Sequence, residues 1–96
     1  MADASTKPLL ILFTAVRDGP SRRTEGHLAQ VLQRRRNHAT FSIRKVTSET
    51  RPDLLDRFRI DRTPTLVVVD GNRVRGRLPQ PRGCEEIKTF LAPWLR

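Results

Sequence analysis

Hydrophobic residues in the first half of the chain change from strand-like to helix-like spacing and back. Residues 9–15 form a continuous apolar run, which is typical of a central strand that is covered on both faces. Within 21–36 the apolar residues recur at helical spacing, and they predict an amphipathic helix. Residues 41–46 alternate in polarity and predict a second strand. This half therefore predicts a strand, a helix and a strand.

The second half predicts two more helices and a hairpin. A short helix is expected to begin at Arg51-Pro52-Asp53 and to be followed by a β-branched buried strand at 66–69. The turn signal at 70–72 leads into 73–78, which alternates in polarity as a returning edge strand. A last helix is expected from Cys84 or Glu85 onward. Its buried stripe is expected to consist of Ile87, Phe90, Leu91, Trp94 and Leu95.

The order β-α-β-α-β-β-α predicts an α/β fold. Parallel strands joined by a helix and followed by an antiparallel hairpin form a mixed four-stranded sheet in a three-layer α/β/α sandwich. A chain of 96 residues supports a single core. We expect a disordered N-terminal tail at 1–7 and one domain at 8–96.

Charge and composition narrow the partners and the compartment. The chain carries 19 basic and 10 acidic residues, a net charge of +9, which fits either a polyanionic partner or a solvated basic surface. No apolar run reaches membrane-spanning length, and 1–7 lacks the pattern of a signal peptide. A single cysteine rules out an internal disulfide. We therefore expect a cytoplasmic protein without membrane contact, either a monomer or a weak homodimer.

Two short motifs carry a family resemblance. Gly19-Pro20 follows the first strand, and Pro64-Thr65-Leu66 opens the β-branched strand. With the ungapped match of 41–66, these motifs make the chain resemble the thioredoxin family. In that family an aromatic residue and Cys-Gly-Pro-Cys close the first core strand, and a cis-proline faces the cysteines. The resemblance implies the minimal thioredoxin fold, with Pro64 as the cis-proline and Lys45 at the position of a buried lysine.

The departures from this pattern concern the redox chemistry. Asp18 and Ser21 occupy the two cysteine positions, Arg17 replaces the family tryptophan, and Leu12 replaces a buried acid that assists proton transfer. Thiol–disulfide exchange needs an attacking thiolate and a second sulfur, which neither Asp18 nor Ser21 supplies. We expect a redox-inactive member without catalytic residues, cofactor or metal.

The resemblance also implies a groove in which three loops grip an extended peptide. Here those loops are rich in arginine, whose forked guanidinium group suits carboxylates and phosphates. We therefore expect an acidic protein or peptide as the partner, although the same arginines could simply face water. The groove residues implied are Arg17, Arg22, Arg23, Arg62, Thr63, Pro64 and Arg82.

Other interpretations remain open. The nearest imidazole to Ser21, that of His27, lies six residues away and cannot readily act as its base, so a nucleophilic Ser21 is not expected. Asp18 is expected to cap the following helix by accepting hydrogen bonds from its exposed N–H groups. Cys84, near a helix start, could form a mixed disulfide or act in thiol transfer. A more distant resemblance to KaiB clock proteins would imply a regulatory interaction module. Few aromatic residues remain outside the predicted core, so we expect only weak, non-specific nucleic-acid binding. His27 and His38 are too isolated to form a metal site.

Overall fold

Seven elements in the predicted order make up the fold in the computed structural model, which describes residues 7–15, 19–33 and 40–95. The strands are β1 (Leu9–Thr14), β2 (Ser42–Thr47), β3 (Thr65–Asp70) and β4 (Arg73–Pro79). The helices are α1 (Gly19–Gln33), α2 (Pro52–Arg57) and α3 (Cys84–Leu91). The α/β prediction is confirmed, with one mixed four-stranded sheet in the order β2-β1-β3-β4. Residues 1–6 of the predicted tail at 1–7, and residues 34–36 at the end of the predicted first helix, lie outside the described residues.

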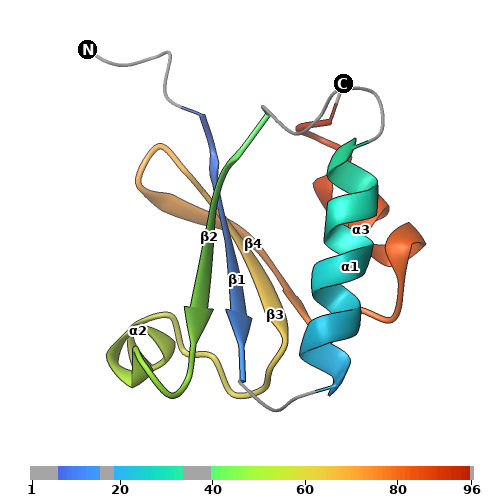
Figure 1. Cartoon of the computed structure of the whole chain (residues 1–96). Helices are drawn as coiled ribbons and strands as arrows, with labels where there is room; N and C mark the ends of the chain where they lie inside the picture. Colours follow the sequence, from blue (N-terminus) through green and yellow to red (C-terminus); the bar gives the residue numbers. More distant parts are fainter. Residues whose placement is uncertain (1–6, 16–18, 34–39, 96) are drawn as a thin grey trace.

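The sheet is covered on both faces, with α1 and α3 together on one side and α2 on the other (Figure 1). Strand β1 runs parallel to β2 and antiparallel to β3, so it is central, as its continuous apolar run predicts. Leu10 and Leu12 point into the core beneath α1 and α3, whereas Ile11 and Phe13 point into the smaller core beneath α2. Phe13 and Phe58 of that smaller core pack with ring centroids 5.5 Å apart.

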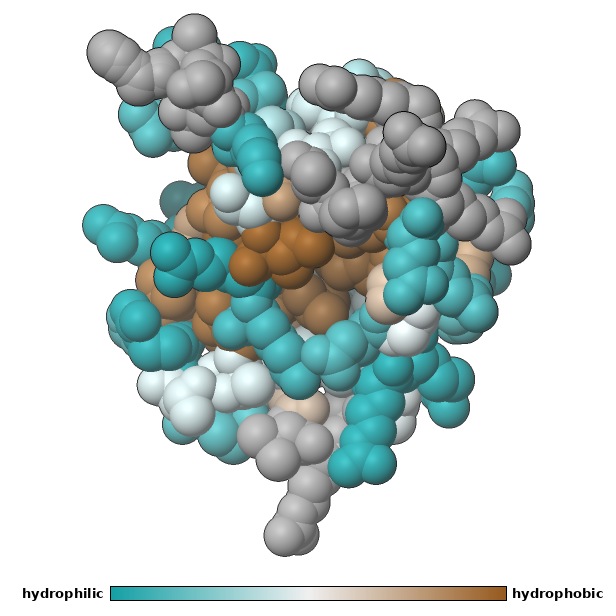
Figure 2. Space-filling model, turned by 45° about the horizontal axis from the view of Figure 1, so that its top comes forward, coloured by the Kyte–Doolittle hydropathy of each residue, from teal (hydrophilic) through white to brown (hydrophobic). Residues whose placement is uncertain are grey.

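The larger core holds the predicted stripes of α1 and α3. Ile87 and Leu91 are fully buried, and Trp94 packs on Phe41 with ring centroids 6.3 Å apart. Helix α3 ends at Leu91, earlier than the predicted stripe, but Trp94 still contacts the core from the turns that follow. In Figure 2 apolar atoms gather near the middle of the visible face, among hydrophilic side chains. The exposed Ile43 on the edge strand β2 contributes to the apolar surface of the molecule.

The β3–β4 hairpin departs from the predicted simple alternation. Gly71 and Asn72 both have positive φ, as a type I′ hairpin turn requires. The register then shifts between Val68 and Val69, because β4 carries one extra residue there. Val74 therefore pairs with Val69 above the α2 core, while Leu78 packs in the core beneath α1 and α3. The predicted uniform alternation of 73–78 is wrong because this bulge exchanges the two faces midway.

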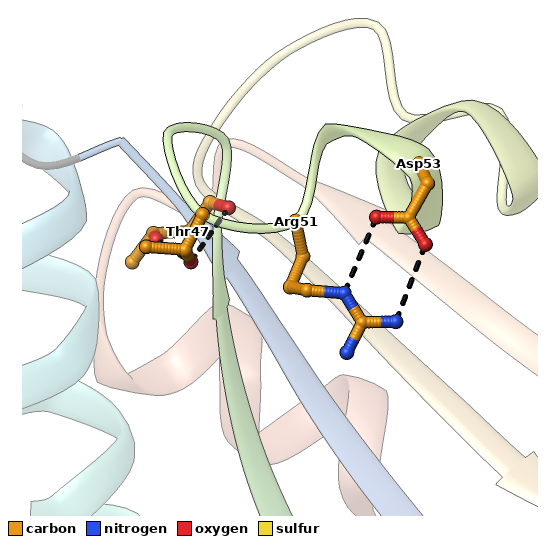
Figure 3. Close-up of polar contacts among 4 residues, drawn as sticks. Thr47, Arg51 and Asp53 are labelled. Atoms are coloured by element: carbon orange, nitrogen blue, oxygen red, sulfur yellow. Dashed lines mark hydrogen bonds and ion pairs between the residues drawn. The ribbon is translucent and has the colours of Figure 1, made fainter.

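A charged pair lies at the start of α2 (Figure 3). The Arg51 guanidinium donates two hydrogen bonds of 3.2 Å to the Asp53 carboxylate. These hydrogen bonds hold the pKa of Asp53 below its ordinary value and raise the pKa of Arg51. Just before it, the Thr47 and Thr50 hydroxyls are hydrogen-bonded to each other. The Arg51–Asp53 pair is solvent-exposed, so we expect it to contribute little to the stability of the fold.

Candidate functional site

The start of α1 corresponds to the position of the missing cysteines. Gly19 and Pro20 form the first helical turn, and the buried Ser21 hydroxyl accepts a hydrogen bond of 3.4 Å from the Ala15 N–H. This contact ties the helix to the end of β1, so Ser21 has a structural role. Arg17 and Asp18, including the expected capping by Asp18, lie outside the described residues.

The loop before β3 contains the Thr63–Pro64 peptide bond, which is cis. Pro64 is buried, and its carbonyl accepts a hydrogen bond of 2.7 Å from the Gln80 N–H at the end of β4. The Thr65 hydroxyl donates to the Arg62 carbonyl. These contacts fix the loop against the neighbouring strand, and Arg62 projects from it as an exposed residue.

A groove of about 550 Å³ lies between this loop, the end of β4 and the start of α3. We call it the basic groove. Arg62 and Arg82, both predicted as peptide-binding residues, line it together. Its lining consists of Arg59, Ile60, Asp61, Arg62, Thr65, Arg77, Pro79, Gln80, Arg82 and Glu86. Among the described lining residues, four arginines and two acidic residues give the groove a net positive charge.

Two of the four arginines that line the basic groove, Arg59 and Arg77, were not predicted from the sequence. Arg59 follows α2 with a φ of 57°, an unusual conformation for a residue other than glycine. The Arg77 guanidinium reaches the Arg59 carbonyl at 3.5 Å, so the two residues lie side by side. Glu86 accepts a hydrogen bond of 2.7 Å from the Arg82 backbone N–H, which places one groove carboxylate beside the start of α3.

Arg22 lies in a second hollow of about 240 Å³, between the N-terminal turns of α1 and the ends of β1 and β2. We call it the α1 hollow. Its lining consists of Thr14, Ala15, Ser21, Arg22, Glu25, Lys45 and Thr47. Lys45 is exposed and pairs with Glu25 at 2.7 Å. The implied burial of Lys45 is wrong, because β2 is an edge strand. Arg23, also a predicted groove residue, is exposed on α1.

Cys84 is the first residue of α3, where it is half-buried against α1. Its thiol donates to the Gln30 side-chain oxygen at 3.0 Å and lies 3.8 Å from the His27 carbonyl oxygen. His38 lies outside the described residues, and within the described ranges no group of histidine, cysteine and acidic residues could hold a metal ion. Cys84 thus packs between two helices.

This packing predicts slow thiol modification. Because the Cys84 thiol is hydrogen-bonded and half-buried, we expect it to react with an aromatic disulfide reagent at least about tenfold more slowly in the folded chain than in urea. Gln30→Ala should speed the reaction in the folded chain, because it removes the acceptor of the thiol. Gln33→Ala is the matched control, since Gln33 is an exposed glutamine on the same helix, and it should leave the rate unchanged. Equal rates in the folded and unfolded chain would show that this packing does not protect Cys84, and a faster rate in the folded chain would favour a reactive, redox-responsive thiol.

Comparison with known proteins supports the fold. No protein-family model matches the chain, and no curated protein sequence matches it. Among solved structures it is similar to Trxlp from Edwardsiella tarda EIB202, with a TM-score of 0.81 and 20% identity over 97% of this chain and 86% of that one. A second similar structure comes from work on the thiol resolving mechanism in yeast mitochondrial 1-Cys peroxiredoxin via glutathione/thioredoxin systems. Its TM-score is 0.76, with 20% identity over 92% of this chain and 80% of that one.

A third similar structure, described as a malarial protein, has a TM-score of 0.76 and 11% identity, covering 95% of this chain and 100% of that one. At these identities the similarity establishes the fold, which is thioredoxin-like. Among the helices within the described ranges, none is long and apolar enough to span a bilayer.

Proposed function

We propose that this chain is a non-catalytic binding module with a thioredoxin-like fold, and that it holds an acidic, extended peptide segment of a partner protein in the basic groove. The observation that carries the proposal is the set of four arginines, Arg59, Arg62, Arg77 and Arg82, around one groove. They come from the loops on either side of β3 and β4 and from β4 itself. An acidic segment crossing the groove would therefore meet guanidinium groups on both sides.

The groove also lies where the family resemblance implies peptide binding. Arg62 precedes the cis-proline and Arg82 precedes α3, so two of the three implied loops contribute to it. Asp61 and Glu86 add negative charge to its lining, which favours a ligand with separated acidic residues over a dense polyanion. Redox catalysis is not part of the proposal, because the one cysteine is Cys84 and its thiol contacts Gln30.

Binding of a fluorescein-labelled peptide of alternating glutamate and valine, followed by fluorescence anisotropy, tests this function. We expect affinity to fall steeply from about 10 to about 150 mM salt, since the Debye length shortens from about 30 to about 8 Å. Arg62→Gln should weaken binding by up to about fivefold, the effect of one exposed charge pair. Arg75→Gln, on β4 but outside the lining of the groove, should change it by less than half as much.

Two outcomes would contradict the proposal. Equal losses in the Arg62→Gln and Arg75→Gln variants would mean that net charge, and not the groove, attracts the peptide. Tighter binding of a single-stranded oligonucleotide of the same charge would assign the basic surface to nucleic acid.

A further inference from the structure

Among the residues that the structure describes, the α1 hollow and the basic groove share none, so the hollow needs a separate explanation. It is formed by the carboxyl ends of the parallel strands β1 and β2 and by the first turns of α1 between them. Thr14 pairs with Thr47 in the strand register, and Leu12 pairs with Lys45. Since side chains alternate along a strand, Thr14, Lys45 and Thr47 share the sheet face that α1 covers.

Thr14 is the unusual residue of this hollow. It is 3% exposed, and its Oγ1 has no hydrogen-bond partner among the residues that the structure describes. A buried hydroxyl without a partner costs free energy, because it has lost its hydrogen bonds to water without replacement. Valine has nearly the same shape and avoids this cost, so packing alone does not explain a threonine here. A ligand in the hollow that accepts a hydrogen bond would explain it.

The charges around Thr14 indicate what that ligand is. Arg22 and Lys45 supply two cationic groups, and Glu25 supplies one carboxylate, which lies 2.7 Å from the Lys45 ammonium. The ammonium has three N–H donors, so Glu25 occupies only part of its capacity. The N-terminal end of α1 adds partial positive charge. Because Asp18 is expected to cap the backbone N–H groups there, we assign the ligand to side chains alone.

We propose that the α1 hollow binds a tetrahedral oxyanion, the chemistry of inorganic phosphate or of a small phosphate monoester. Its donors are the Thr14 hydroxyl, the Arg22 guanidinium and the Lys45 ammonium, which come from β1, α1 and β2. Donors that come from three elements suit a tetrahedral ion, whose oxygens point in several directions, better than a carboxylate, whose acceptor oxygens lie in the plane of one flat group. The volume of about 240 Å³ admits a small anion and is below the roughly 300–1,000 Å³ of pockets for drug-sized ligands.

Titration of the full chain with inorganic phosphate, followed by amide chemical shifts, tests the proposal. We expect saturable shifts at Thr14, Arg22 and Lys45 with a dissociation constant of about 1 mM or tighter. Lys45→Gln and Arg22→Gln should each weaken binding about fivefold or more. Arg44→Gln is the matched control, because Arg44 precedes Lys45 on β2 and projects from the opposite face of the sheet. A similar loss in Arg44→Gln would overturn the proposal.

Thr14→Val gives a second, independent readout. We expect it to weaken phosphate binding about fivefold while the midpoint of thermal unfolding without phosphate stays the same or rises, since the unpartnered hydroxyl is gone. Unchanged phosphate affinity, or a lower midpoint in the absence of phosphate, would contradict the assigned role of Thr14. Neither result depends on peptide binding in the basic groove.

The sign of the electrostatics and the source of the anion can be tested in the same way. Glu25→Gln removes the one carboxylate among the described residues of the hollow and should tighten phosphate binding severalfold; weaker binding would overturn the proposed charge balance. Glycerol phosphate distinguishes the two sources. Binding as tight as that of inorganic phosphate assigns the site to monoesters, whereas weaker binding assigns it to the free ion. Absence of saturable binding by both would overturn the proposal.

Discussion

Phe13→Ala is expected to lower the free energy of unfolding by about 3–5 kcal/mol. Phe13 lies on the central strand and is fully buried, and its ring packs on Phe58 in the smaller core. Small domains have total stabilities of about 5–15 kcal/mol, so the loss would be a large part of the whole. It would also loosen the groove, because Phe58 directly precedes Arg59.

Urea unfolding followed by the fluorescence of Trp94, the only tryptophan, measures this loss from the opposite side of the sheet. Val74→Ala is the matched control on the same face, because Val74 is 43% exposed and its truncation should change stability by only about 0.5 kcal/mol. A loss below about 1 kcal/mol in Phe13→Ala would show that the α2 core contributes little to the fold.

The double charge reversal Arg62→Glu/Arg82→Glu is expected to abolish acidic-peptide binding. It leaves two guanidinium groups against four carboxylates in the basic groove. Two attractive contacts are lost and two repulsive ones are introduced, each of about 0.5–1 kcal/mol for exposed charges. Together they correspond to a fall in affinity of roughly 30-fold or more.

Two controls make this experiment specific. Arg73→Glu/Arg75→Glu changes the net charge by the same amount on a part of the hairpin outside the groove lining, and it should lower affinity only slightly. A peptide of alternating lysine and valine should bind the reversed groove better than it binds the original. If both double variants lose affinity equally, the groove is not the binding site.

The order of the seven elements could be predicted from the sequence because each apolar run has a clear period and the turn residues separate them. The set of residues that line the basic groove could not be predicted from the sequence, and Arg77 shows the reason. Counting back from the hairpin turn without a bulge would pair Arg77 with Leu66, beneath α1 and α3. The extra residue in β4 instead pairs it with Val67, on the α2 face beside Arg59.

The α1 hollow likewise could not be predicted from the sequence. Arg22 was expected among the peptide-binding residues, and Lys45 was expected to be buried, whereas both line the α1 hollow. The partnerless hydroxyl of Thr14 depends on tertiary contacts, and a threonine at a strand end has no sequence signal that reveals it. Arg17 and Asp18 lie outside the described residues, and their predicted roles stay predictions.

Gly76 determines how closely helix α3 approaches strand β4. A Cβ atom at this position would lie 2.9 Å from Cε1 of Phe90 on α3, closer than side-chain atoms normally come. Even one methyl group would therefore act as a wedge between helix and strand. Arg82 precedes α3, so the width of the basic groove depends on the absence of a side chain at Gly76, on the face of β4 that α3 covers.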